Sequence, residues 1–293
     1  MGEFFSLVCA LMWGCAVIFF RLAGLTVPPL ALNLFRVTVS SLLFLITMAV
    51  TRTPLLHAAP LRDYLILMFS GVIAIAVSDT LFHMSLNRVG AGLNAVVDAL
   101  YSPFMVLTAF LMLGERLGPR DLVGMVLIIT GVVVATRVKP PAGASRRTLV
   151  VGILIGAGAM ATLAFGIVMA KPVLERSDVL WSTAVRQLGA LAALVPAAVI
   201  SPGRRGIWSV FRPRRVWRYS LPGTVMGSYL ALLFWIAGMK YTRAGTAAIL
   251  NQTSTIYILI LATLVLHEPF TRRKALAASL SVGGVMLVLR PGF

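Results

Sequence analysis

The chain carries one sequence pattern twice, and this doubling constrains its fold more than any other feature. A shift of 150 residues, growing to 153 further along, aligns these pairs: Gly2 with Gly152, Arg21 with Lys171, Arg36 with Arg186, Gly92 with Gly245, Glu115 with Glu268, Gly131 with Gly284, and Arg137 with Arg290. Each copy holds five hydrophobic segments, and an odd number of membrane crossings inverts the second copy relative to the first. Inverted repeats of this kind are typical of secondary transporters. The doubling therefore predicts a transporter.

The composition places the chain in a membrane. Hydrophobic residues make up 59% of it and charged residues 12%, with a mean hydropathy of +0.94, which is too apolar for a soluble domain. A bilayer core of about 30 Å needs about 20 apolar residues per helix. The candidate segments are 4–23, 29–50, 64–86, 92–113, 120–136, 149–170, 178–200, 216–239, 245–266 and 273–290. We expect an all-α integral membrane protein with ten transmembrane helices, arranged as two inverted five-helix repeats at 1–140 and 149–293.

The net charge of +17 does not indicate a nucleic-acid partner. Lys and Arg lie mostly in the loops, where they orient the helices against the lipid bilayer and the insertion machinery. Of the 26 basic residues, two lie inside segments, nine on the side of the N-terminus and 15 on the opposite side. This count predicts both termini outside the cell, because cytoplasmic loops carry the excess of Lys and Arg. The loops of the first half alone favour the opposite orientation.

Several short motifs resemble one transporter family. They are Trp13-Gly14, Asn33-Leu34-Phe35-Arg36, Leu113-Gly114-Glu115-Arg116, Leu266-His267-Glu268-Pro269, and the Gly-Val pairs at Gly131 and Gly284. In this order, and in both halves, they resemble the EamA family of the drug/metabolite transporter superfamily over nearly the whole chain. The resemblance implies a ten-helix secondary carrier of a bacterial-type inner (plasma) membrane, with both termini cytoplasmic. Many members export amino acids or other metabolites, and the fifth and tenth helices pack outside the helices that line the cavity. The arginine-rich stretch 204–218 would then face outward.

Three charged residues lie at one depth in the first half. Arg36 is seven residues into its segment, Asp79 seven before the end of the next, and Asp98 six into the one after. At 1.5 Å per residue, all three lie roughly 9–10 Å from the same membrane face. We expect an ionic cluster, because an unpaired charge at that depth is costly. One arginine cannot neutralise two carboxylates, so a proton is a candidate coupling ion, with His83 one turn after Asp79 extending its path. The alternative is a structural ion pair.

The second half keeps the arginine and loses the acids. Arg186 is equivalent to Arg36, whereas Asn251 stands in the place of Asp98. Two interpretations remain open for Arg186. It binds an anionic group such as a substrate carboxylate, or it reaches the interface or the carbonyls at a helix end.

A polar lining follows the fourth and ninth segments. Asn94, Asp98 and Tyr101 share one helical face, and Asn251 and Gln252 lie at the equivalent position of the second half. Aromatic residues that can wall a cavity are Trp13, Tyr101, Tyr229, Trp235 and Tyr257. These side chains fit a small-molecule cavity at the repeat interface or hydrogen bonds between helices.

Other features favour a carrier over the alternatives. Glu115 and Glu268 lie at segment ends beside basic residues, which indicates structural caps or interfacial pairs. We expect no metal site, no cofactor and no enzymatic activity, since the three histidines lack metal-ligand spacing and no nucleophile motif is present. ATP use is not expected without a Gly-rich phosphate loop. A channel or a membrane scaffold is the competing class, and the oligomeric state stays open.

Overall fold

The computed structural model describes residues 1–56, 58–114, 118–138, 144–241 and 250–288, and these residues form helices and no strand. The first half contains α1 (Gly2–Ala23), α2 (Pro29–Val50), α3 (Leu61–Gly71), η1 (Val72–Val77), α4 (Ser78–Val89), α5 (Ala91–Asp98), α6 (Tyr101–Leu113) and α7 (Pro119–Ala135). The second half contains α8 (Arg146–Leu174), α9 (Val179–Ile200), α10 (Arg204–Trp208), η2 (Ser209–Phe211), α11 (Trp217–Gly223), η3 (Thr224–Leu230), α12 (Ala231–Tyr241), α14 (Ser254–Leu264) and α15 (Arg272–Val288).

The helices cover the predicted hydrophobic segments. Seven helical stretches in the described residues are long and apolar enough to cross a membrane, and they are Gly2–Ala23, Pro29–Val50, Leu61–Val89, Ala91–Leu113, Arg146–Leu174, Val179–Ile200 and Trp217–Gly238. The other three predicted segments correspond to shorter helices. These are α7 and α15, of 17 residues each, and the stretch Leu250–Leu264. An all-helical membrane protein is therefore confirmed, while ten crossings stay a prediction.

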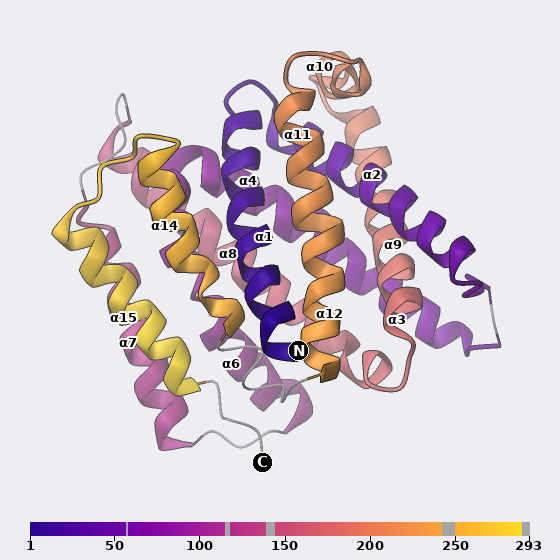
Figure 1. The fold of residues 1–293 in the computed structure, drawn as a ribbon, viewed down its shortest axis with the longest axis horizontal. Coiled ribbons are helices and arrows are strands. Elements are labelled where there is room, and N and C mark those ends of the chain that lie inside the picture. Colours follow the sequence, from indigo (N-terminus) through magenta and orange to yellow (C-terminus); the bar gives the residue numbers. More distant parts are fainter. Residues whose placement is uncertain (57, 115–117, 139–143, 242–249, 289–293) are drawn as a thin grey trace.

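The helices run roughly along one direction and form a bundle (Figure 1). The N-terminus lies at one end, here called the N-terminal face. The other end carries α10, the α1–α2 turn and the loop between α14 and α15 (Figure 1), and is called the arginine-rich face because Arg204–Arg218 lies there. Buried apolar side chains from both halves form one large core, from Ala16 to Val285, and a smaller cluster packs around Phe44 and Trp181.

Two long helices each contain a π-helical segment, at equivalent positions of the two halves. A π-helical segment, η1, joins α3 to α4, and a second, η3, joins α11 to α12. Adding the repeat shift of 153 to Val72–Val77 gives residues 225–230, which fall within η3. In a π-helical segment the backbone hydrogen bonds span five residues rather than the four of an α-helix. In the first half, the side-chain amide of Asn33 donates to two carbonyls of this segment, those of Ile75 and Ala76.

Two further helical stretches are each interrupted by a turn. Between α5 and α6 the chain forms a turn at residues 99–100. Pro103 explains it, since proline has no N–H to donate to the carbonyl of Ala99, which instead accepts from Ser102 at 3.2 Å. In the second half a turn at Thr253, 153 residues after Leu100, precedes α14 without a proline at the equivalent site.

Helices α7 and α15 lie side by side at one edge of the bundle (Figure 1). Glycines permit their close approach. A Cβ added at Gly284 would lie 2.6 Å from the carbonyl oxygen of Gly124, and one added at Gly131 would lie 2.8 Å from that of Ala277. The two repeat-equivalent glycines therefore serve the contact between the helices that end the two halves.

Candidate functional site

An ion pair between Arg36 on α2 and Asp79 on α4 lies inside the bundle. Arg36 is 5% exposed, and its guanidinium lies over the ring of Phe20, 5.8 Å from the centroid. Its Nε has no hydrogen-bond partner among the described residues. Two of the three charges predicted at this depth therefore meet, and Arg36 keeps a free donor.

Asn33 sets the alignment of the two helices that carry this pair. It lies one turn before Arg36 on α2, and its Nδ2 donates to the carbonyls of Ile75 (3.0 Å) and Ala76 (3.2 Å) and to Thr80 Oγ1 (3.0 Å). Asn33 lies in one of the family motifs, but no positioning role was predicted for it from the sequence. The three-residue spacing from Arg36, which puts both on one helical face, is the signal that points to it.

His83 is enclosed by aromatic rings. Its ring lies edge-on to Phe20 and Phe82, with centroids 5.2 Å and 5.4 Å away. Neither ring nitrogen has a hydrogen-bond partner among the described residues. His83 therefore lies near Arg36, at its predicted position one turn after Asp79. It forms no hydrogen bond with either of them.

Asp98 stands apart from the ion pair. It ends α5 at the helix interruption and accepts a hydrogen bond of 3.1 Å from Asn94 Nδ2, one turn earlier. Among the described residues no ion pair includes it. The predicted three-member cluster is thus not formed, because depth along a helix does not determine the direction in which a side chain points.

Arg186 on α9 lies toward the N-terminal face and contacts the first half. Its Nε donates to Ser70 Oγ at 3.1 Å, and the same hydroxyl donates to the carbonyl of Gly166 at 2.7 Å. Tyr101, at the start of α6, lies within electrostatic range of the guanidinium. Arg186 has no carboxylate partner among the described residues. Ser70 was not predicted, since nothing in the sequence pairs it with Arg186.

The remaining candidates of the second half divide into inner and outer positions. Asn251 Oδ1 has no hydrogen-bond partner among the described residues, and Gln252 donates weakly to Thr255 Oγ1 at 3.4 Å. Tyr229 shares a 2.6 Å hydrogen bond with Thr47 on α2. Trp235 is 40% exposed. In the first half, Trp13 packs against Phe82 with centroids 6.0 Å apart.

Glu268 joins the two halves at the arginine-rich face. Its carboxylate accepts from the backbone N–H groups of Ala91 (2.7 Å) and Gly92 (3.1 Å) at the start of α5. Lys274, whose side chain is 7% exposed, donates to it at 3.2 Å. The predicted role of a cap and ion pair is confirmed for Glu268, while Glu115 lies outside the described residues.

Gly90 makes this capping geometry possible. Its φ of +83° suits glycine, and a Cβ there would lie 2.6 Å from Glu268 Oε1. The carboxylate also meets the positive end of the α5 dipole. Helix α5 is thus fixed by a residue 177 positions further along the chain.

A second polar contact joins the halves at the N-terminal face. Arg176, between α8 and α9, forms an ion pair of 2.6 Å with Asp63 at the start of α3. Trp181 Nε1 donates to the carbonyl of Leu55 at 2.9 Å. Polar contacts between the halves therefore exist at both ends of the bundle.

No group of three or more His, Cys, Asp or Glu side chains that could hold a metal occurs in the described residues. The interior holds a paired arginine, a second arginine bonded to a hydroxyl, and a carboxylate bonded to an amide. The pocket beside Thr26–Pro28 and the apolar pocket between α14 and α15 are lined by none of the predicted site residues.

Comparison with known proteins agrees with this architecture. The model of the EamA-like transporter family matches residues 1–137 and again 150–290. The uncharacterized transporter YvbV of Bacillus subtilis is 24% identical over 285 residues, covering 95% of this chain and 88% of its own length. An uncharacterized transporter of Methanothermobacter thermautotrophicus is 23% identical over 231 residues, covering 78% and 65%. The crystal structure of another protein, 16% identical, superposes with a TM-score of 0.65 over 98% of this chain and 95% of that one.

Proposed function

The chain belongs to the EamA-like transporter family, and we propose that it is a secondary active carrier of small metabolites that works by alternating access. Membership of this family and the apolar helices make it a multi-pass membrane transporter. The finer proposal concerns its architecture, its coupling and its substrate.

The proposed architecture is ten crossings in two inverted repeats, residues 1–140 and 149–293. Support comes from features that recur 153 residues apart, namely the π-helical segments η1 and η3 and the helix interruptions at Leu100 and Thr253. Transporter sites are commonly built where helices are interrupted near the midplane. Helices α7 and α15 would cross the membrane outside the moving part.

Alternating access requires that the contacts between halves at each face break in turn. The Glu268 contact to α5 closes the arginine-rich face, and the Asp63–Arg176 pair closes the N-terminal face. Each is made of few polar groups at the end of the bundle. We propose that breaking one of them accompanies the opening of that face toward the shared interior.

Coupling to protons is assigned to Asp98. Asp79 forms an ion pair with Arg36, whereas among the described residues Asp98 has no ion-pair partner and accepts a hydrogen bond from the amide of Asn94. An uncompensated carboxylate inside the bilayer is costly, and a bound proton removes that cost. Asp98 is thus the described interior carboxylate suited to load and release a proton during the cycle.

The proposed substrate is an amino acid or an amphiphilic compound that carries an anionic group, moved outward. Arg186 lacks a carboxylate partner among the described residues, and Tyr101 lies near it. A guanidinium with free donors binds a carboxylate in two hydrogen bonds. The protein is expected in a bacterial-type inner membrane with both termini cytoplasmic, although the count of loop charges favours the opposite orientation.

The observation that carries the proposal is the Asp98 carboxylate, which lies at the interruption of an apolar helix and has no cationic partner among the described residues. Metabolite profiling of cells with and without the protein would supply candidate substrates. Uptake of each into proteoliposomes would then be measured with and without unlabelled substrate inside. A carrier shows uptake accelerated by internal substrate. Uptake without this acceleration would identify a channel, and no uptake of any profiled compound would count against transport of metabolites.

A further inference from the structure

The arginine-rich segment between α9 and α11 is a folded structure rather than a loose connector. Ile207 and Val210 are 4% and 3% exposed. Phe211 and Trp217 pack against Phe35 of α2, with centroids 5.8 Å and 5.4 Å away. Trp217 Nε1 also donates to the carbonyl of Val210 at 2.8 Å. The segment is therefore held against the end of α2.

This fold presents a set of arginines without acidic partners. Six arginines and no acid lie in the segment, namely Arg204, Arg205, Arg212, Arg214, Arg215 and Arg218. All six are exposed, and none of the ion pairs between described residues includes them. Arg218 lies over the ring of Tyr219 at 4.6 Å. Like charges gathered in this way repel one another, so an anion bound among them is favourable.

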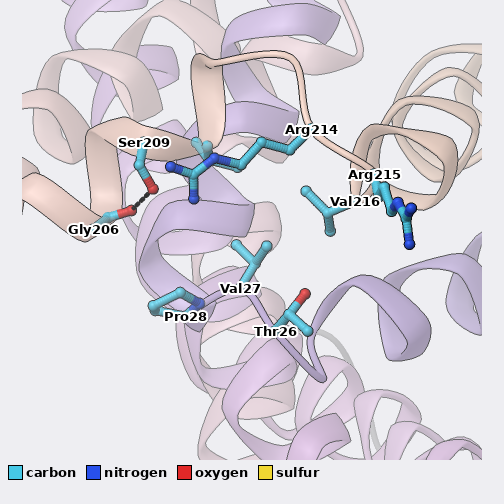
Figure 2. A pocket seen from close by; sticks show the side chains of 9 residues that line it. Thr26, Val27, Pro28, Gly206, Ser209, Arg214, Arg215 and Val216 are labelled. Atoms are coloured by element: carbon cyan, nitrogen blue, oxygen red, sulfur yellow. Dashed lines mark hydrogen bonds between the residues drawn. The ribbon is translucent and has the colours of Figure 1, made fainter.

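A pocket of about 230 Å³ opens beside these arginines. Its wall joins the α1–α2 turn, Thr26–Pro28, to Gly206–Val210 and Arg214–Val216. Figure 2 shows the guanidinium of Arg214 extending toward Ser209, while Arg215 lies on the other side beside Val216. Pockets that enclose a drug-sized ligand measure about 300–1,000 Å³. This smaller pocket has room for a phosphate ester group rather than for a whole drug-sized ligand.

The pocket lies where a lipid headgroup would be. Thr26–Pro28 connects the end of one apolar span to the start of the next, so it lies at the membrane surface. Trp208, Trp217 and Tyr219 flank the pocket in the sequence, and such aromatics favour the headgroup region. Val27 and Val216 add an apolar wall suited to the glycerol and upper acyl carbons of a lipid.

We propose that this pocket binds the phosphate of an anionic phospholipid through Arg214 and Arg215. Guanidinium groups bind phosphate oxygens in paired, charge-assisted hydrogen bonds. A soluble phosphate ester shares this chemistry, but it lacks the acyl chains that would lie along the membrane ends of α1 and α2. The site is independent of the transport proposal, because it lies at the surface of the bundle.

Native mass spectrometry of the purified protein in detergent tests the proposal. Phosphatidylglycerol, zwitterionic phosphatidylethanolamine and glycerol 3-phosphate are titrated separately. The test variant is Arg214→Gln/Arg215→Gln. Its matched control is Arg146→Gln/Arg147→Gln, another exposed adjacent pair on the same face, at the start of α8. A third variant, Arg214→Lys/Arg215→Lys, keeps the charge and removes the paired hydrogen bonds.

The wild type and the control variant are expected to prefer phosphatidylglycerol over phosphatidylethanolamine. The Gln variant should bind phosphatidylglycerol about thirtyfold more weakly, and the Lys variant should lie between. Equal losses in the Gln variant and in the control would overturn the site, since they would reflect net charge alone. Binding of glycerol 3-phosphate as tight as that of phosphatidylglycerol would overturn the assignment to a lipid.

Discussion

The backbone N–H of Ala91 donates a 2.7 Å hydrogen bond to the carboxylate of Glu268, so the start of a helix in the first half depends on a side chain of the second. The same carboxylate accepts from Gly92 and from the buried ammonium of Lys274. Three donors of one face therefore rely on a single residue.

Glu268→Ala is expected to lower the stability of the protein. It would leave two backbone donors and Lys274 without their acceptor. A hydrogen bond to a charged group contributes about 1.5–3 kcal/mol to the free energy of unfolding. Thermal unfolding in detergent measures the change. Glu175→Ala, which removes a carboxylate 67% exposed, is the control and should leave the midpoint unchanged. An unchanged midpoint in Glu268→Ala would contradict the capping role.

The Arg36–Asp79 pair predicts a distinctive pattern of single and double substitutions. Arg36→Leu or Asp79→Leu alone leaves one charge buried and should cost about 3–5 kcal/mol. The double variant Arg36→Leu/Asp79→Leu should unfold at a higher temperature than either single variant, because no charge remains unpaired. Comparing the three unfolding midpoints tests this. Additive losses in the double variant would show that the two residues do not act as a pair.

Asp98→Asn is expected to separate coupling from exchange. The amide keeps the shape of the carboxylate but cannot carry a proton. Counterflow of substrate in proteoliposomes should therefore persist, while accumulation driven by an imposed pH gradient should disappear. Glu3→Gln, an exposed carboxylate near the N-terminus, should retain both activities. Gradient-driven accumulation by Asp98→Asn would reject Asp98 as the coupling residue.

Neighbouring glycines on α15 offer a matched test of helix packing. A Cβ at Gly284 would lie 2.6 Å from the backbone oxygen of Gly124, whereas one at Gly283 would meet nothing within 4 Å. Gly284→Ala should therefore separate α7 from α15 and lower the unfolding midpoint, since overpacking costs about 1–3 kcal/mol. Gly283→Ala should not lower it. Equal midpoints for the two variants would contradict the close contact.

Hydropathy predicted the all-helical architecture. Apolar length placed the helices, since the bilayer sets that length. The depths of Arg36 and Asp79 along their helices correctly predicted that these two side chains meet. The same reasoning failed for Asp98, because the interruption before Pro103 and the rotation of each helix determine where a side chain points. The contacts of Glu268 with Ala91 and of Arg186 with Ser70 join distant parts of the chain, and no local pattern specifies them.

The π-helical segment η1 also determines which residues of α4 face the interior. A π-helical segment holds one more residue than an α-helical path would need, and each residue of an α-helix turns the chain by about 100°. The face presented by α4 is thus offset from the face presented by α3, which turns Asp79 toward Arg36. Deleting one residue within Val72–Val77 would rotate the whole of α4 about its own axis. This segment therefore determines the rotation of the helix as well as its length.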